Sequence, residues 1–167
     1  MSSFLRLLEN DVASAAILLG VPSFVRPSKA KGAKAVGIRY ERKVLAFLSE
    51  RHAHFVASPW FRYTLRAFAG RVNYAQPDGL FIDPAQGLVT IVEVKYAHTA
   101  DAYFQLMDKY VPILKCFLRS ATVDWKIAVV EIVHWYDAST AFPVRAQLLE
   151  DPLFARPNTF GVHILRP

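Results

Sequence analysis

The sequence is poor in cysteine and in long apolar runs, and both scarcities bound the chemistry open to the protein. One cysteine, Cys116, stands among 167 residues, which excludes an internal disulfide and a zinc site built from several cysteines. We expect Cys116 to be a buried structural thiol in a reducing compartment. The apolar stretch 4–20 is interrupted by Arg6, Glu9 and Asp11, so it falls short of the ~18 uncharged residues of a membrane-spanning helix.

Several functional signatures are also missing. The sequence has no repeat at solenoid spacing, no phosphate-binding P-loop, no dinucleotide-type glycine fingerprint and no nucleophile elbow. The apolar stretch near residue 1 lacks the positively charged start of a secretory signal. We therefore expect a soluble, cytoplasmic protein with no membrane partner.

The composition is that of one folded domain with a basic surface. Hydrophobic residues make up 53% of the chain and charged residues 20%, which excludes a disordered chain. Lys and Arg number 20 against 14 Asp and Glu, giving a net charge of +6. A basic domain of this kind favours a polyanionic partner.

The periodicity of apolar residues predicts the secondary structure in outline. Residues 22–37, rich in proline, glycine, serine and cations, have the composition of a linker or flexible arm. Helical spacing predicts helices over 4–19, 38–51, 100–118 (kinked or split at Pro112) and, weakly, 144–150. Strand patterns predict strands over 61–66, 78–83, 88–95, 126–135 and 161–165. The order helix, three strands, helix, strand predicts an α/β (α+β) fold, a mixed central sheet flanked by helices.

Two carboxylates are predicted to face each other across a hairpin. Glu93 lies within an otherwise apolar strand, where a carboxylate is costly unless it is paired or bound to metal. If Pro84–Gly87 forms the loop, Asp83 faces Leu88, and the same register places Asp78 opposite Glu93, with Cβ atoms ~5 Å apart. A divalent cation would relieve their repulsion, although Lys95, on the same face as Glu93, could supply part of that charge.

Glu41 is a third acid of interest. Its helical neighbours at i+3, i+4 and i+7 are apolar, so it lies on or beside the buried stripe of its helix. It either reaches solvent from the edge of the stripe or converges on the hairpin acids. A metal held by Asp78, Glu93 and Glu41 beside a cationic Lys95 suits phosphodiester hydrolysis, in which Lys95 would orient or deprotonate water or stabilise charge on the phosphate.

At these residues the sequence resembles the PD-(D/E)XK nuclease superfamily. Pro77-Asp78, then fourteen residues, then Glu93-Val94-Lys95 matches its signature. The resemblance spans about residues 36–135 and implies a restriction-endonuclease-like αβββαβ core. It also implies Mg²⁺ or Mn²⁺ as cofactor, held by Asp78, Glu93, the Val94 carbonyl and Glu41, the last lying where many members carry a metal-binding glutamate. Gln105 lies where several branches carry an active-site glutamine.

Two branches of that superfamily can be compared with this sequence. The segment Gly37 to Arg42 resembles the archaeal Holliday junction resolvase branch. Branches related to the RecB nuclease domain carry a histidine on the first helix and a tyrosine four residues after the glutamine, whereas this chain has no such histidine and has Lys109 at that position. On this interpretation 1–167 is a single nuclease-like domain, with an amino-terminal helix and basic arm over 1–35 and an extension over 136–167.

A cluster of cations precedes and enters the helix of Glu41. Seven fall within eighteen residues, with Glu41 as the only acid: Arg26, Lys29, Lys31, Lys34, Arg39, Arg42 and Lys43. They are either a solvated arm or contacts for a nucleic-acid backbone, and Arg62 and Arg66 could extend the patch. Among the other candidates, His98 could reach a phosphate, and the three tryptophans favour core or edge positions over base stacking.

The sequence therefore favours a metal-dependent nuclease that hydrolyses DNA, in DNA processing, recombination, repair or restriction. The sequence is also compatible with RNA as the substrate and with a homodimer as the assembly. The alternative is a non-catalytic nucleic-acid-binding or interaction module that retains the nuclease fold. A third, more distant interpretation is a structural or assembly protein whose acids form ordinary ion pairs.

Overall fold

A six-stranded mixed sheet forms the centre of the protein. The structure is a computed structural model that describes residues 6–25, 31–68, 70–137 and 146–167. The strands lie in the order β2-β5-β6-β7-β9-β8. β5 pairs antiparallel with both β2 and β6, whereas β6, β7, β9 and β8 run parallel to one another. Their bounds are β2 Phe55–Ala57, β5 Gly79–Asp83, β6 Leu88–Ala97, β7 Lys126–Trp135, β8 Gln147–Leu149 and β9 Phe160–Ile164.

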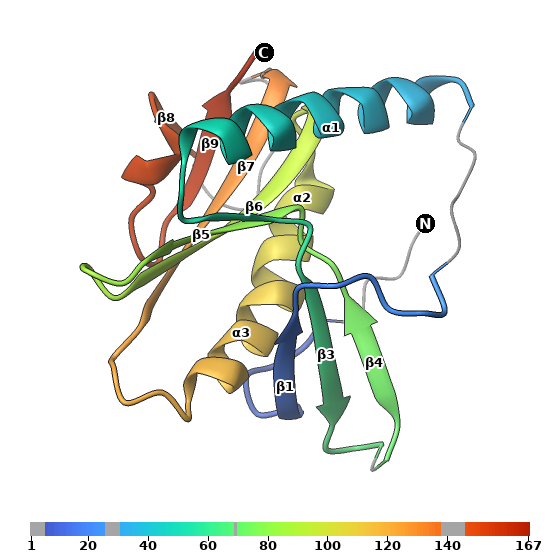
Figure 1. The fold of residues 1–167 in the computed structure, drawn as a ribbon, viewed down its shortest axis with the longest axis vertical. Coiled ribbons are helices and arrows are strands. Elements are labelled where there is room, and N and C mark those ends of the chain that lie inside the picture. Colours follow the sequence, from blue (N-terminus) through green and yellow to red (C-terminus); the bar gives the residue numbers. More distant parts are fainter. Residues whose placement is uncertain (1–5, 26–30, 69, 138–145) are drawn as a thin grey trace.

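Helices cover both faces of this sheet (Figure 1). On one face α1 (Ala33–Arg51) packs Val44 and Leu48 into a core cluster with Val92 and Val94 of β6. On the other face lie α2 (Ala100–Gln105), the π-helical turn η1 (Leu106–Tyr110) and α3 (Val111–Leu118). The predicted α/β class with a mixed sheet flanked by helices is therefore confirmed. No helix in the described ranges is long and apolar enough to cross a membrane.

The predicted hairpin is present with the predicted register. Asp83 pairs with Leu88 and Gly79 pairs with Val92, as expected for a loop over Pro84–Gly87. β5 begins one residue after Asp78, so Asp78 lies at the open end of the β5–β6 ladder. Gly87 adopts φ 58° in this loop, a left-handed conformation that glycine tolerates at little cost.

The predicted helix over 100–118 changes from α-helical to π-helical and back again just before Pro112. A proline has no N–H, so the carbonyl of Asp108, four residues earlier, loses its helical donor. The chain passes through η1 just before this point, and the Asp108 carbonyl instead accepts the N–H of Leu7 at 2.8 Å. The helical conformation continues through Pro112, so the structure shows a change of helix type before the proline and not a split, and the amino-terminal segment satisfies the group that the proline leaves without a partner.

The predicted helix over 4–19 is wrong over its described part, 6–19, whereas 4 and 5 lie outside the described residues. Residues Val12–Leu18 form β1, which pairs with β3 (Trp60–Leu65), and β3 pairs with β4 (Val72–Ala75) in a separate three-stranded sheet. A turn precedes β1, in which the Asp11 carboxylate accepts the N–H of Leu8 at 2.7 Å and interrupts the helical spacing. The seven-residue apolar run that follows fits either period, and pairing with β3 decides it.

Three further expectations need correction. The strand predicted over 61–66 is β3 of the small sheet, and the place beside β5 in the central sheet belongs to the short β2. The helix predicted over 144–150 is wrong from residue 147 on, because β8 lies there and pairs with β9, while 144 and 145 lie outside the described residues. The helix that carries Glu41 begins at Ala33 rather than at residue 38, so the second half of the expected linker is helical.

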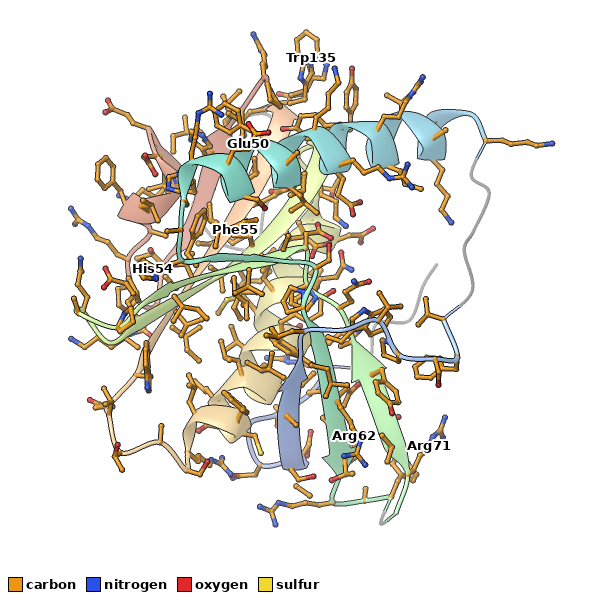
Figure 2. The ribbon with its side chains drawn as sticks, viewed as in Figure 1. Glu50, His54, Phe55, Arg62, Arg71 and Trp135 are labelled. Carbon is orange, nitrogen blue, oxygen red and sulfur yellow. The ribbon has the colours of Figure 1, made fainter. Side chains whose placement is uncertain are left out.

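We predict that Gly79→Ala destabilises the protein, because a Cβ at this position would meet the buried ring of Phe55 at 2.4 Å. Figure 2 shows Phe55 just below the carboxyl-terminal half of α1. Overpacking of this kind costs about 1–3 kcal/mol in the free energy of unfolding. The matched control is Gly37→Ala in α1, where nothing lies within 4 Å and alanine should stabilise the helix by up to about 1 kcal/mol. Urea unfolding measures both, and equal effects of the two substitutions would contradict the packing argument.

Candidate active site

Four side chains from three elements gather where the β5–β6 ladder opens. Asp78 immediately precedes β5, and Glu93 and Lys95 lie two residues apart on β6, on one face of the strand. Glu41 approaches from α1, where its side chain is half-buried. Electrostatic coupling of Glu41 to Asp78, Glu93 and Lys95 places it in the same cluster.

Pro77 explains why the ladder opens at this point. Continued in register, the ladder would pair Val94 with Pro77, which has no N–H to donate. The Val94 N–H instead donates to the Asp78 carboxylate at 2.6 Å. Because the N–H and C=O of a strand residue point to the same side, the Val94 carbonyl is also directed toward Asp78. The sequence Pro77-Asp78 thus replaces backbone pairing by a carboxylate and leaves a carbonyl beside it.

Lys95 donates a hydrogen bond to only one of the two carboxylate oxygens of Glu93. Its ammonium donates to Oε1 of Glu93 at 2.6 Å. The second carboxylate oxygen, Oε2, is buried and has no hydrogen-bond partner among the described residues. A buried carboxylate oxygen without a partner is costly. The site therefore has an unsatisfied acceptor directly beside two other acids.

Burial and mutual repulsion raise the pKa values of the acids. Burial raises the pKa of Asp78 well above its ordinary value, and the neighbouring Glu93 and Glu41 raise it further, against the Val94 N–H and Lys95. Burial likewise raises the pKa of Glu93, although the contact with Lys95 opposes this. Burial also raises the pKa of Glu41. Negative charge on all three acids at once is therefore unfavourable in the metal-free protein.

Two lysines border the acids, and their pKa values are shifted in opposite directions. Burial acts to lower the pKa of Lys95, but Glu93, Asp78 and Glu131 outweigh it and raise that pKa above its ordinary value. Lys109, in η1, is half-buried, and burial lowers its pKa against the attraction of Glu93. Lys95 is therefore a firmly protonated cation in the metal-free protein, whereas Lys109 gives up its proton more readily.

A second buried acid lies beside the first cluster. Glu131 of β7 is the register neighbour of Glu93 and is completely buried. Its carboxyl group contacts Nδ1 of His98 at 2.5 Å and accepts the N–H of Thr99 at 3.2 Å. Burial raises the pKa of Glu131 to about 8, while burial lowers the pKa of His98. Both directions favour an uncharged pair that fixes the start of α2 against the sheet.

The predicted residues separate into those that the fold brings together and those that it does not. Glu41, Asp78, Glu93, Val94 and Lys95 meet at one place. Gln105 is half-buried at the end of α2 and its side chain makes no hydrogen bond to a described residue, so its role stays a prediction.

The predicted DNA-binding cations are only partly described, because Arg26 and Lys29 lie outside the described residues. The other five are exposed, and all but Lys31 lie on α1: Lys31, Lys34, Arg39, Arg42 and Lys43. Four of these five cations therefore belong to a helix and not to a flexible arm. Arg62 lies in the small sheet, and Figure 2 shows it at the end of the molecule opposite α1, so it does not extend this patch. The Nε of Arg66 donates to the Asn10 carbonyl at 2.8 Å, which ties it to the segment before β1.

Two residues near the acids, Glu131 and Lys109, were not predicted from the sequence to take part in the site. The pattern of Lys126 to Trp135 gives a signal for Glu131, because a lone acid in a buried strand stands out in the same way as Glu93. Lys109 carries no such signal, since its placement depends on the π-helical turn. Across the described ranges, no three His, Cys, Asp or Glu side chains already form a metal-binding group.

Comparisons with family models, with curated proteins and with solved structures give no match to this chain.

We predict that Glu131→Gln stabilises the protein relative to wild type more at high pH than at low pH. The folded-state pKa of Glu131, about 8, lies above its unfolded value, so ionisation in the fold costs stability as pH rises between the two values. Glutamine keeps a hydrogen-bonding group toward Thr99 and His98 but does not ionise. Thermal melts in EDTA at about pH 5 and about pH 9 measure the difference between the two proteins. A difference that shrinks as the pH rises would contradict the raised pKa.

Proposed function

We propose that this protein is a divalent-metal-dependent nuclease that hydrolyses phosphodiester bonds in DNA. The observation that carries the proposal is the acid cluster at the open ladder end. Glu93 is buried, Asp78 is half-buried, the two repel each other, and Oε2 of Glu93 has no partner among the described residues. A phosphodiesterase site needs a cation held at such a place.

The residues present fit Mg²⁺ or Mn²⁺. Mg²⁺ is bound through one or two carboxylates and keeps several waters, so it needs no preformed cage of three acids. Asp78 and Oε2 of Glu93 would supply the carboxylate ligands, and the Val94 carbonyl a further oxygen. Glu41 would act directly or through water. Such a metal would lower the pKa of a bound water and polarise the phosphoryl oxygens.

Lys95 has a defined role in this proposal. Its ammonium is protonated in the metal-free protein and lies 2.6 Å from Glu93. In that state Lys95 suits an electrostatic partner for charge that develops on the phosphate, and it can also orient water. A cation bound to Asp78 and Glu93 would lower the pKa of Lys95, so the role of a base also stays within the proposal.

The topology supports a restriction-endonuclease-like αβββαβ core. Along the chain, α1 is followed by β2, β5 and β6, then by α2 to α3, then by β7, and these strands are neighbours in the order β2-β5-β6-β7. In this interpretation β3 and β4 are an insertion between the first and second core strands. β8 and β9 extend the sheet beyond β7.

The cations of α1 support DNA as the polyanion. Arg39, Arg42 and Lys43 are exposed on the helix that also carries Glu41, and they form no ion pair with a described residue. Backbone phosphates are the expected partners of such cations, and their contacts make binding salt-dependent.

We predict that millimolar Mn²⁺ or Mg²⁺ raises the melting temperature of the wild-type protein. A ligand that binds only the folded state stabilises it by RT ln(1 + [L]/Kd), and this ligand would also relieve the repulsion between Asp78 and Glu93. Asp78→Asn should remove most of this shift. The control is Asp124→Asn, an exposed acid in the loop before β7, which should keep it. Equal shifts in the wild type and in Asp78→Asn would place the metal elsewhere.

We predict that Lys95→Ala lowers the rate of DNA cleavage in Mg²⁺ or Mn²⁺ by ~10²–10³, with DNA and metal binding largely kept. The assay uses labelled duplex, single-stranded and junction DNA, and thermal melts confirm that the variant folds. Lys126→Ala, an exposed lysine at the start of β7, is the matched control. Wild-type protein that binds DNA but cleaves none of these substrates would favour the binding module in place of the nuclease.

A further inference from the structure

The outer face of the three-stranded sheet carries an exposed aromatic cluster. Trp60 and Arg62 lie two residues apart on β3, and Arg62 pairs with Tyr74 of β4, so the register puts all three on this face. The chain after β1 crosses this end of the sheet (Figure 1). It lays the ring of Phe24 on Tyr74, with centroids 4.7 Å apart, and edge-on to Trp60 at 6.4 Å. Phe24 is still 57% exposed, so its ring is accessible to a ligand.

The opposite face of the same sheet is closed. Phe61, Tyr63 and Leu65 alternate with the outer residues along β3 and are buried. They belong to the core cluster that also contains Ile113 and Leu114 of α3. A ligand of the sheet surface therefore has to approach the outer face.

The charge around this face is of one sign. The sequence has no Asp or Glu over 12–40 or over 51–77, and all three strands of the small sheet lie in these ranges. Arg62 and Arg71 are exposed and form no ion pair with a described residue, and Figure 2 shows them on β3 and beside β4. The carboxylate of Asp11, just before β1, already accepts a backbone N–H. Cations without acidic partners favour a polyanion.

Anionic membranes and nucleic acids both combine apolar surface with negative charge. Leu19 and Val21, on the same segment as Phe24, are 78% and 71% exposed, which suits either partner. The aromatic ring favours nucleic acid, because Phe24 packs on Tyr74 of the sheet and does not project from it as a membrane anchor would. A ring held in this way suits a base that stacks on it.

We infer that the outer face of the small sheet binds single-stranded DNA, with Phe24 stacking on a base and Arg62 and Arg71 contacting phosphates. Single-stranded DNA is favoured over duplex because the bases of a duplex stack on one another and cannot cover a protein ring. Aromatic side chains on a sheet surface are a recurrent means of holding unpaired bases.

This surface adjoins the candidate active site. Tyr74 precedes Asp78 by four residues, which span at most ~14 Å. The N–H of Ser58, two residues before Trp60, donates to the Asp78 carbonyl at 2.7 Å. A strand held on the sheet would therefore lie close to the acid cluster. That link rests on the proposed nuclease function, whereas binding to the sheet does not.

The test measures DNA binding without cleavage. Fluorescence anisotropy in EDTA at low salt follows labelled oligo-dT of about 15 nucleotides and a duplex of equal length. Phe24→Ala should weaken oligo-dT binding roughly 5- to 100-fold and duplex binding less than about twofold, because only unpaired bases stack on the ring. Phe24→Tyr, which keeps a ring, should restore most of the affinity.

Arg62→Gln tests the phosphate contact separately. It should weaken oligo-dT binding and flatten its salt dependence by about 0.7 in the log–log slope, the value for one lost phosphate contact on a single strand. The matched controls lie on the segment between β8 and β9, where Phe154 is 64% exposed and Arg156 is also exposed. Phe154→Ala and Arg156→Gln should leave the affinity and the salt slope unchanged.

Thermal melts confirm that each variant folds. Oligo-dT affinity that neither Phe24→Ala nor Arg62→Gln changes overturns the inference, and so does an equal loss for oligo-dT and duplex in Phe24→Ala. Sedimentation with vesicles of phosphatidylcholine and phosphatidylserine that depends on Phe24, while oligo-dT binding does not, would assign the surface to a membrane instead. Because EDTA prevents metal-dependent cleavage, a protein that shows the expected losses but never cuts DNA keeps this surface and loses the nuclease.

Discussion

The close approach of two carboxylates that repel each other, the buried Glu93 and the half-buried Asp78, determines how the surrounding groups are arranged. Asp78 and Glu93 meet where Pro77 stops the β5–β6 ladder, so the cost of burying them is offset by groups that a continuous ladder would have used elsewhere. The Val94 N–H serves Asp78, and Lys95 serves one oxygen of Glu93. These two contacts leave Oε2 of Glu93 without a partner among the described residues. Under the proposed function, a cation bound between the two acids would satisfy this oxygen and stabilise the folded protein.

The two faces of the sheet contribute different charges to this place. α1 brings Glu41 on its inner side and exposed cations on its outer side, so one helix serves both the acids and the candidate DNA surface. On the other face, η1 brings Lys109 near Glu93, and β7 brings Glu131 beside it in register. The local field therefore alternates in sign over short distances, which suits a site that must attract both a metal cation and a phosphate anion.

The parts of the fold that were predicted from sequence are those in which a single local rule decides. The loop over Pro84–Gly87 fixes the hairpin register, and that register alone brings Asp78 to Glu93. The failures share one cause, which is that partners distant in the sequence override local preference. Val12–Leu18 is alanine-rich and fits a helix, but it becomes a strand beside β3. Likewise, the alternating pattern of β3 gave no indication of which sheet the strand joins, and β2, at three residues, is too short for periodicity to reveal.

The placement of Lys109 shows how far the site depends on chain outside the segment that resembles a nuclease. Pro112 removes the donor that the Asp108 carbonyl needs, and Leu7 supplies it from before β1. The side chain of Leu7 is itself buried in the same core cluster as Tyr110 and Ile113. The hydroxyl of Tyr110 in turn donates to the Gln76 carbonyl, two residues before Asp78. The amino-terminal segment thus holds η1 in place, η1 holds the approach to Asp78, and loss of that segment would loosen both Lys109 and the loop that carries the first carboxylate.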